Sequence, residues 1–336
     1  MGKELSLTGK IVREYLSREK KKEPKNRLSK KALAKLIYKE NVEVFSSVEH
    51  TRGVIRYHTG QLGYKSRSDA VSKEFWDMKR EIPESLVEEW RPFVIPKAYK
   101  NLLVLSDIHV PYHERDAVWS AVHYGKENGC DAVLLNGDVM DFYQLSRYDK
   151  DPRKRGFEQE IKLGREFFAW LRSMFDCPIY FKLGNHEERY QAYLRKKAPE
   201  LLEVPEWEMG VLLKCGENKI EVIDDKRIIK FGNLNILHGH EFQSGFSSPI
   251  NPARTFLMKM NANVLCGHVH RSSTHREKVV GGRPIQGFTT GCLCELEPEY
   301  ARINKYTLGF ARVERLEEDN VRVHNLLIDD GEVIYS

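Results

Sequence analysis

The chain has 336 residues, 41% of them hydrophobic, and its 54 basic and 49 acidic side chains give a net charge of +5. This length and content suffice for one large or two ordinary domains. No run of about 18 apolar residues is present and the N-terminus lacks the apolar core of a secretory signal, so we expect no membrane contact. Six scattered cysteines form neither a disulfide framework nor a paired zinc spacing, which predicts reduced thiols in the cytoplasm.

The charge is distributed unevenly along the chain. Residues 1–68 carry 17 basic and 7 acidic side chains, a net charge of +10, whereas the remainder has a net charge of −5. This asymmetry indicates two units with different partners. We predict a basic helical module at residues 1–68, a connector at residues 69–98 with one helix over residues 72–79, and a larger domain at residues 99–336.

Apolar residues at helical spacing predict three short helices in the basic module, over residues 5–22, 30–39 and 48–58. Such a set is typical of a helix-turn-helix module, whose last helix enters the major groove of DNA. That helix would present polar side chains to base edges: His50, Thr51, Arg52 and Arg56. Lysines would meet the phosphates: Lys20, Lys21, Lys22, Lys30 and Lys31. The alternative is a helical bundle whose basic face is solvated or docks on a protein.

Five apolar strands follow, and each ends in residues of metal-binding type. The strands are predicted at residues 102–105, 131–136, 178–183, 234–237 and 263–266. The blocks after them are Asp107-Ile108-His109, Gly137-Asp138, Gly184-Asn185-His186-Glu187, His238-Gly239-His240 and Gly267-His268-Val269-His270. A predicted helix over residues 116–128 makes the first two strands a parallel β-α-β pair. Ligands gather at the carboxyl ends of such strands, and in an extended chain Asp107 and His109 would point the same way.

One such block has an ordinary explanation as a capped strand end, but five in succession do not. The ordered motifs D-x-H, G-D-x-x-D, G-N-H-E, H-G-H and G-H-x-H resemble those of the calcineurin-like metallophosphoesterase superfamily. The resemblance covers about residues 100–295 and does not extend to residues 1–95. It implies an α/β fold, a four-layer α/β/β/α sandwich with a two-metal centre at the strand ends, here preceded by a small all-α helix-turn-helix-like module.

The resemblance also implies roles for individual residues. Asp107, His109 and His270 would bind one metal, Asn185, His238 and His268 the other, and Asp138 would bridge both. His240 is the alternative to His238. Mixed carboxylate, imidazole and amide-oxygen ligands favour two divalent ions, with Mn²⁺ preferred and Fe, Zn²⁺ or Ni²⁺ as alternatives.

The implied chemistry is direct attack on phosphorus by a metal-bridging hydroxide while both metals clamp the phosphate oxygens. His186 would be the general acid, and Asp141 would orient it and raise its basicity. Basic residues near the motifs would bind substrate, unless they are plain surface charge: Arg147, Arg153, Lys154, Arg155 and Arg189. Residues 247–252 are predicted to form a rim loop. Residues 306–313, 321–328 and 333–335 alternate like antiparallel strands that would pair with the second sheet.

The sequence therefore predicts a two-metal-dependent phosphoester hydrolase, favouring a phosphodiesterase or nuclease to which the basic module delivers DNA or RNA. One alternative is a phosphomonoesterase or cyclic-nucleotide phosphodiesterase whose N-terminal module docks on a protein. Another is a binding protein that kept the fold and lost catalysis, which the intact ligand set and His186 disfavour. Asp141-Phe142-Tyr143 replaces the D-R-G of protein serine/threonine phosphatases, which disfavours that activity. The shared metal centre cannot choose among the remaining substrates.

Overall fold

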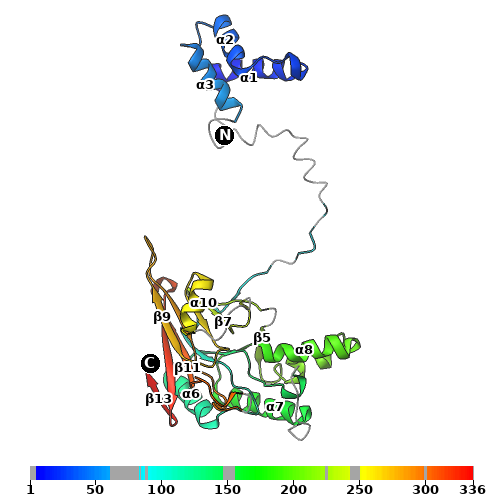
Figure 1. Ribbon diagram of the computed structural model, residues 1–336, viewed down its shortest axis with the longest axis vertical. Helices are drawn as coiled ribbons and strands as arrows, with labels where there is room; N and C mark the ends of the chain where they lie inside the picture. The colour runs from blue at the N-terminus through cyan, green and yellow to red at the C-terminus, as the bar shows by residue number, and fades with distance from the viewer. Residues whose placement is uncertain are drawn as a thin grey trace. The chain divides into compact units, whose positions relative to one another are not determined.

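The computed structural model describes residues 5–60, 83, 85–87, 90–146, 156–223, 226–242, 250–298 and 301–335. The chain divides into two compact units, Met1–Glu88 and Glu89–Ser336 (Figure 1). Several predictions fall outside the described residues: the helix over 72–79, the first part of the loop at 247–252, and the side chains of Arg147, Arg153, Lys154 and Arg155.

The first unit contains the three helices that the sequence predicts. They are α1 (Leu7–Lys20), α2 (Lys30–Glu40) and α3 (Val48–His58), and each begins after a serine, Ser6, Ser29 or Ser47, whose side chain accepts a helix N–H. The helices share a small apolar core made by Val12, Leu33, Ala34, Ile37, Phe45 and Ile55. The module therefore has an apolar core of its own, and of its charged side chains that the structure describes Glu19 is buried.

The second unit contains two sheets. The seven-stranded sheet has, in spatial order, β13 (Glu332–Tyr335), β12 (Val321–Asp329), β11 (Gly309–Arg315), β2 (Asn101–Leu105), β3 (Ala132–Asn136), β4 (Ile179–Lys182) and β5 (Ile220–Ile223). The six-stranded sheet has β1 (Phe93–Val94), β6 (Ile229–Phe231), β7 (Leu234–Leu237), β8 (Val264–Cys266), β10 (Ile285–Thr289) and β9 (Ser273–Glu277). The five predicted strands are β2, β3, β4, β7 and β8.

The helices of this unit are α6 (Arg115–Glu127), α7 (Phe157–Met174), α8 (Asn185–Lys197), the single turn α9 (Met209–Leu212) and α10 (Pro252–Met260). Short 3-10 turns occur at Pro24–Asn26, Tyr143–Leu145, Pro199–Leu201, Pro205–Trp207 and Glu317–Asp319. No helix in the described part of the chain is long and apolar enough to cross a membrane.

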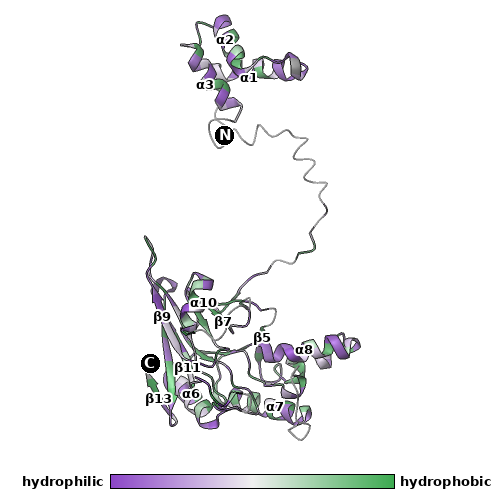
Figure 2. Cartoon of the chain, in the orientation of Figure 1, coloured by the Kyte–Doolittle hydropathy of each residue, from purple (hydrophilic) through white to green (hydrophobic). Residues whose placement is uncertain are grey.

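Alternating side chains of β2 show why the layers form. Leu102 and Val104 face a core between the two sheets, whereas Leu103 and Leu105 face the core beneath α6, α7 and α8. On the other side, Phe256 and Leu257 of α10 pack against β7 and β8. The predicted four-layer α/β/β/α sandwich is confirmed, with α10 on one side of the sheets and α6 and α7 on the other (Figure 1). Figure 2 shows α8 as largely hydrophilic.

The C-terminal strands differ from our expectation. They do not join the sheet of β7 and β8; β11 pairs antiparallel with β2, with Ala311 opposite Val104, and β12 and β13 continue outward from it. The physical reason is that β3 covers only one edge of β2, so the other edge needs a strand to satisfy its backbone groups. The first three strand tips therefore lie inside the larger sheet.

Candidate metal centre

The strand-end blocks of both sheets meet in one buried cluster. Strands β2, β3 and β4 are parallel neighbours, as are β7 and β8, so their carboxyl ends lie together. Asp107 and His238 are completely buried, Asp138 is 1% exposed, and His109 and His270 are nearly buried. Charged and polar groups are buried in such numbers only where they pair with one another or with a metal.

The backbone at these tips is not extended. Asp107, His109, Asp138, His268 and His270 all have positive φ, between 51° and 68°. Asp107 and His109 therefore converge through left-handed backbone, and the expectation that an extended chain points them the same way is wrong. Residues other than glycine adopt this conformation at a cost, which the surrounding structure has to compensate.

Hydrogen bonds between neighbouring tips supply that compensation. The Asp107 N–H donates to Gly137 O (3.2 Å), and the His109 N–H donates to Asp138 O (3.0 Å). Gly137 has a φ of +86°, which is the sharp turn that the sequence predicts before Asp138. At Gly267, an added Cβ would overlap Ser106 Oγ and lie 2.5 Å from Asp107 Oδ2, so only glycine lets the two sheets approach here.

The imidazoles point their Nε2 atoms into the centre. His270 Nε2 lies 3.2 Å from Asp107 Oδ1 and 3.2 Å from His109 Nε2, and His238 Nε2 lies 3.2 Å from Asp138 Oδ2. His240 instead points Nε2 at Glu188 (3.0 Å), which supports His238 rather than His240 as the ligand. Asn185 Oδ1 lies 3.2 Å from His238 Nε2, and the N–H of His268 donates to Asp107 Oδ2 (2.9 Å).

The electrostatics favour a positive charge on two histidines of the cluster, whereas burial lowers the pKa of His109 and lowers that of His268 to about 4. Burial lowers the pKa of His238, but the carboxylates of Asp138 and Asp107 outweigh it and raise the pKa to about 10. Likewise, Asp107 raises the pKa of His270 to about 9 against burial. Burial raises the pKa of Asp138, yet the charges of His238 and His186 keep it well below its usual range. The protons on the imidazoles of His238 and His270 therefore occupy positions where a cation is stable. A bound divalent metal would displace these protons.

The donor set fits divalent metals. Three groups of side chains bring ligand atoms within 4.8 Å of one another: His109 with His270 and Cys294, His109 with Asp138 and His186, and Asp138 with His238 and His268. Imidazole nitrogens with carboxylate and amide oxygens suit Mn²⁺, Fe²⁺ or Zn²⁺. The division of the seven predicted ligands between two metals stays a prediction.

His186 and Asp141 lie beside this cluster, together with Arg189. His186 Nδ1 lies 2.8 Å from Asp141 O and 3.2 Å from Asp141 Oδ1. The same carboxylate is 3.0 Å from Nδ1 of His109, so Asp141 contacts a predicted ligand as well as the predicted general acid. Arg189 donates to His186 Nε2 (2.7 Å) and to Asp141 O (3.0 Å). Burial and Arg189 lower the pKa of His186, but Asp138 and Asp141 raise it more.

Two glutamates that the sequence analysis left without a role organise the tips. Glu187 is completely buried and accepts four backbone N–H groups, from Asp138, Val139, Met140 and Gly184, at 2.8 to 3.0 Å. Glu241 accepts the N–H groups of His238 and Gly239 and pairs with the buried Lys182 Nζ at 2.8 Å. The signal was visible, because both G-N-H-E and H-G-H-E end in glutamate.

The side chains predicted to contact base edges lie in the first unit. Arg56 is exposed, and Arg52 pairs with Glu49 at 3.0 Å. Thr51 is completely buried, and its hydroxyl donates to Ser47 O (3.0 Å). Its predicted contact with bases is therefore wrong, because the inner face of α3 packs against the core of the module.

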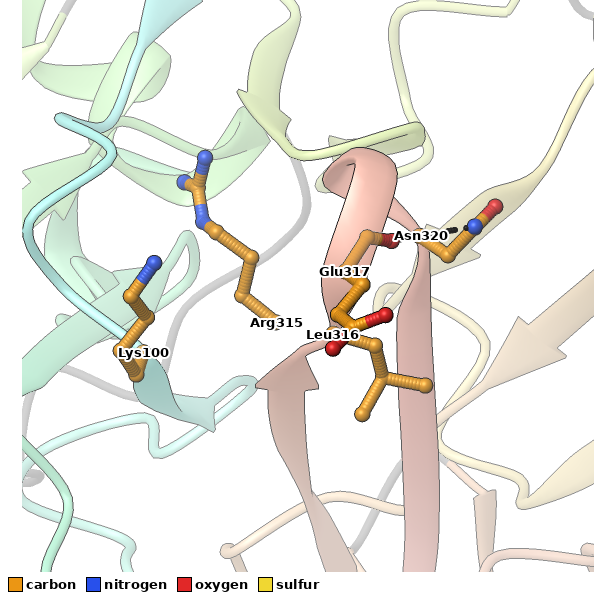
Figure 3. Close-up of a pocket in the computed structure, with 5 residues that line it drawn as sticks. All are labelled: Lys100, Arg315, Leu316, Glu317 and Asn320. Atoms are coloured by element: carbon orange, nitrogen blue, oxygen red, sulfur yellow. Dashed lines mark hydrogen bonds between the residues drawn. The ribbon is translucent and has the colours of Figure 1, made fainter.

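Two surface cavities in the described structure lie away from the cluster. One, of about 610 Å³, is lined by Lys100, Arg315, Leu316, Glu317 and Asn320 (Figure 3). It adjoins the N-terminal end of β2, whereas the predicted ligands follow the C-terminal end. Arg315 in this cavity already donates hydrogen bonds to Asp319 Oδ1 and Ile95 O. The other, of about 820 Å³, lies between α8 and β5. Neither contains the predicted ligands.

This chain was compared with protein families, with curated proteins and with solved structures. Residues 100–272 match the family model described as calcineurin-like phosphoesterase. The Gene 54 protein of Mycobacterium phage L5 is 29% identical over 179 residues, which cover 51% of this chain and 69% of that protein. Vacuolar Protein Sorting 29 from Cryptosporidium parvum has a TM-score of 0.40 and 14% identity, over 71% of this chain and 96% of that one. Yfce, a phosphoesterase from E. coli, has a TM-score of 0.35 and 13% identity, over 70% and 96%.

Glu187→Gln should destabilise the second unit. An amide offers one acceptor oxygen and turns its NH₂ toward backbone donors, so at least two buried N–H groups lose their partner, at a cost of about 3 kcal/mol. Urea denaturation would measure the loss, with the exposed Glu166→Gln as the matched control. Equal stability of both variants would contradict the role of Glu187.

Glu241→Gln should cost about 3–5 kcal/mol at neutral pH, because it leaves Lys182 buried without a counter-charge. Burial raises the pKa of Glu241, but the charge of Lys182 outweighs it and lowers the pKa to about 2. A lowered folded-state pKa contributes stability above the unfolded value, and that stability disappears as the pH falls toward 2. The difference between wild type and variant should therefore shrink on acidification, as measured by denaturation at several pH values. A constant difference would argue against the ion pair.

Proposed function

The chain belongs to the calcineurin-like phosphoesterase family, a membership that supports metal-dependent phosphoesterase activity, and we propose that its substrate is a phosphodiester of nucleic acid. The supporting observation is the presence, in one chain, of a buried Asp/His/Asn cluster at five strand tips and a three-helix module within a segment of net charge +10. The cluster suits hydrolysis of a phosphoester, and the module suits a polyanion.

Asp107, His109 and His270 would hold one divalent ion, Asn185, His238 and His268 the other, and Asp138 both. When bound, two such ions polarise the phosphate and make a nucleophile of water at neutral pH. Mn²⁺ is the ion we favour, with Fe²⁺, Zn²⁺ and Ni²⁺ as alternatives.

The chain's own residues would handle the leaving group and the phosphate charge. Nε2 of His186 accepts from Arg189 in this structure; once Arg189 has turned away, the raised pKa of His186 would let Nε2 take a proton from solvent and pass it to the leaving oxygen. Arg189 now donates to that Nε2, so we propose that it transfers its hydrogen bonds to a phosphate oxygen when substrate binds. Asp141 would keep the imidazole oriented through Nδ1 in both states.

The exposed cations of the first unit support a nucleic-acid partner. Several acidic groups of this unit are already paired: Glu14 with Arg18, Glu19 with Lys22 and Glu49 with Arg52. Among the described residues, no ion pair engages Lys30, Lys31 and Lys35 of α2 or Arg56 of α3, and all four are exposed. A cationic surface without internal counter-charges attracts phosphates of any sequence.

Asp138→Asn should abolish turnover of bis(p-nitrophenyl) phosphate in Mn²⁺, because it removes the carboxylate that both metals would share. Full activity of Asp138→Asn would refute the bridging role.

His186→Ala should retain both metals, as measured by elemental analysis, and lose activity by about 100-fold or more. Loss of metal from His186→Ala would show that His186 is a ligand.

Replacing Lys30, Lys31, Lys35 and Arg56 together by glutamine should weaken binding of double-stranded DNA and flatten its dependence on salt. The logarithmic slope should fall by about 0.9 for each phosphate that the protein no longer neutralises. Fluorescence anisotropy at several salt concentrations measures both quantities, and hydrolysis of the small diester should not change.

The matched control makes the same change of charge in the second unit. It replaces four exposed lysines by glutamine: Lys126, Lys162, Lys219 and Lys230. It should affect DNA binding much less than the α2 and α3 variant. Equal effects of the two variants would mean that binding follows net charge alone. Undiminished DNA binding by both would favour a protein partner for the module.

A further inference from the structure

Three imidazoles of the candidate metal centre each direct Nδ1 toward a different kind of hydrogen-bond partner. His109 Nδ1 lies 3.0 Å from the carboxylate of Asp141, and His238 Nδ1 lies 2.8 Å from the carbonyl of Asn136. His270 Nδ1 faces a thiol, 3.9 Å from Sγ of Cys294. A carboxylate and a carbonyl are common partners of a metal-binding histidine, whereas a thiol in this place is not.

The backbone fixes where this thiol stands. The N–H of Leu293 donates to Asp107 O (3.0 Å), and the N–H of Glu295 donates to Tyr112 O (2.9 Å). Cys294, between them, forms an antiparallel bridge with His113. The segment is therefore joined on both sides of Cys294 to the loop that follows β2, which contains the predicted ligands Asp107 and His109.

A second set of bonds ties the same segment to His270. The N–H of Cys292 donates to Thr307 O (2.9 Å), and the N–H of Thr307 donates to His270 O (2.9 Å). These bonds hold the backbone on the N-terminal side of Cys294 close to the backbone of His270. Cys294 is 5% exposed, so bulk water does not compete for the imidazole N–H.

We propose that Cys294 is a positioning residue for the metal centre. Its sulfur accepts a hydrogen bond from Nδ1–H of His270 and so keeps Nε2 of that ring directed at Asp107 and His109. The inference rests on the proposed function, since it takes His270 as a metal ligand. Among the described residues, no other side chain is hydrogen-bonded to Nδ1 of His270, whose ring is otherwise contacted by the ring of Tyr306 at 4.7 Å between centroids.

Packing alone is the competing explanation, because cysteine is also a small apolar residue. The two explanations differ for serine. Cys294→Ser keeps a hydrogen-bond acceptor in a smaller side chain, whereas Cys294→Ala removes the acceptor. A positioning role predicts that Cys294→Ser restores the Mn²⁺ affinity that Cys294→Ala loses. Packing predicts that both variants lose the same Mn²⁺ affinity.

The experiment is calorimetric titration of the metal-free full chain with Mn²⁺. Loss of a hydrogen bond that orients a ligand typically weakens metal binding by about 10- to 100-fold, so Cys294→Ala should lose this much at one of two sites. Cys294→Ser should return to within about fivefold of wild type, in keeping with the same rule. Equal affinity of wild type and Cys294→Ala would overturn the proposal, as would equal losses in Cys294→Ala and Cys294→Ser.

Cys215→Ala is the matched control. Cys215 is another buried cysteine of the same unit, 1% exposed, in the core beneath α6, α7 and α8 and outside the groups of possible ligands. It should keep wild-type Mn²⁺ affinity while losing thermal stability as Cys294→Ala does. A loss of affinity as large as that of Cys294→Ala would mean that any cavity in this unit disturbs the site, and would overturn the proposal.

A second measurement separates this inference from the proposed function. In the metal-free protein, the Nδ1–H proton of His270 should give a protected NMR signal, identified by its absence in His270→Gln. The signal should persist in Cys294→Ser and disappear in Cys294→Ala, whether or not Mn²⁺ binds. Failure of the wild type to bind Mn²⁺ would refute the proposed function alone, and an unchanged signal in Cys294→Ala would refute the role of Cys294.

Discussion

The carboxylate of Glu187 is the group on which the arrangement of the site depends. It accepts four backbone N–H groups, three from the segment after β3 and one from Gly184 at the start of α8. Such a carboxylate replaces the solvent that these N–H groups lose on burial. It thereby joins the tip that presents Asp138 to the tip that presents Asn185 and His186, and it is itself completely buried.

The same constraint explains why the tips can be strained. Five predicted ligands lie in the left-handed region of backbone conformation, each at a cost that an isolated loop would avoid. Backbone bonds between adjacent tips, together with Glu187 and Glu241, hold these turns in place. The strain has a use, because a turn directly after a strand projects a carboxylate or an imidazole back over the strand end, where ligands from both sheets meet.

The two units obey different physical rules. In the second, opposite charges are buried against one another and are stable there because each has a partner at about 3 Å. In the first, exposed lysines of α2 have no counter-charge among the described residues, and the helices are held by an apolar core. Selective chemistry requires buried, paired charges like those of the second unit. Attraction of a polyanion requires only exposed cations like those of the first unit.

The sequence by itself determined the strands that end in the predicted ligands and the helical module, because these depend on local periodicity and on residue chemistry. It also contained Glu187 and Glu241 at the ends of two motifs, but not their function. Only the tertiary structure decided that β11 covers β2, that Thr51 faces inward, and that Asp107 and His109 converge through a left-handed turn. It also decided that Cys294 stands against His270, 24 residues away in sequence. These features depend on contacts between distant segments, which local patterns do not encode, so they appear only once both sheets are packed.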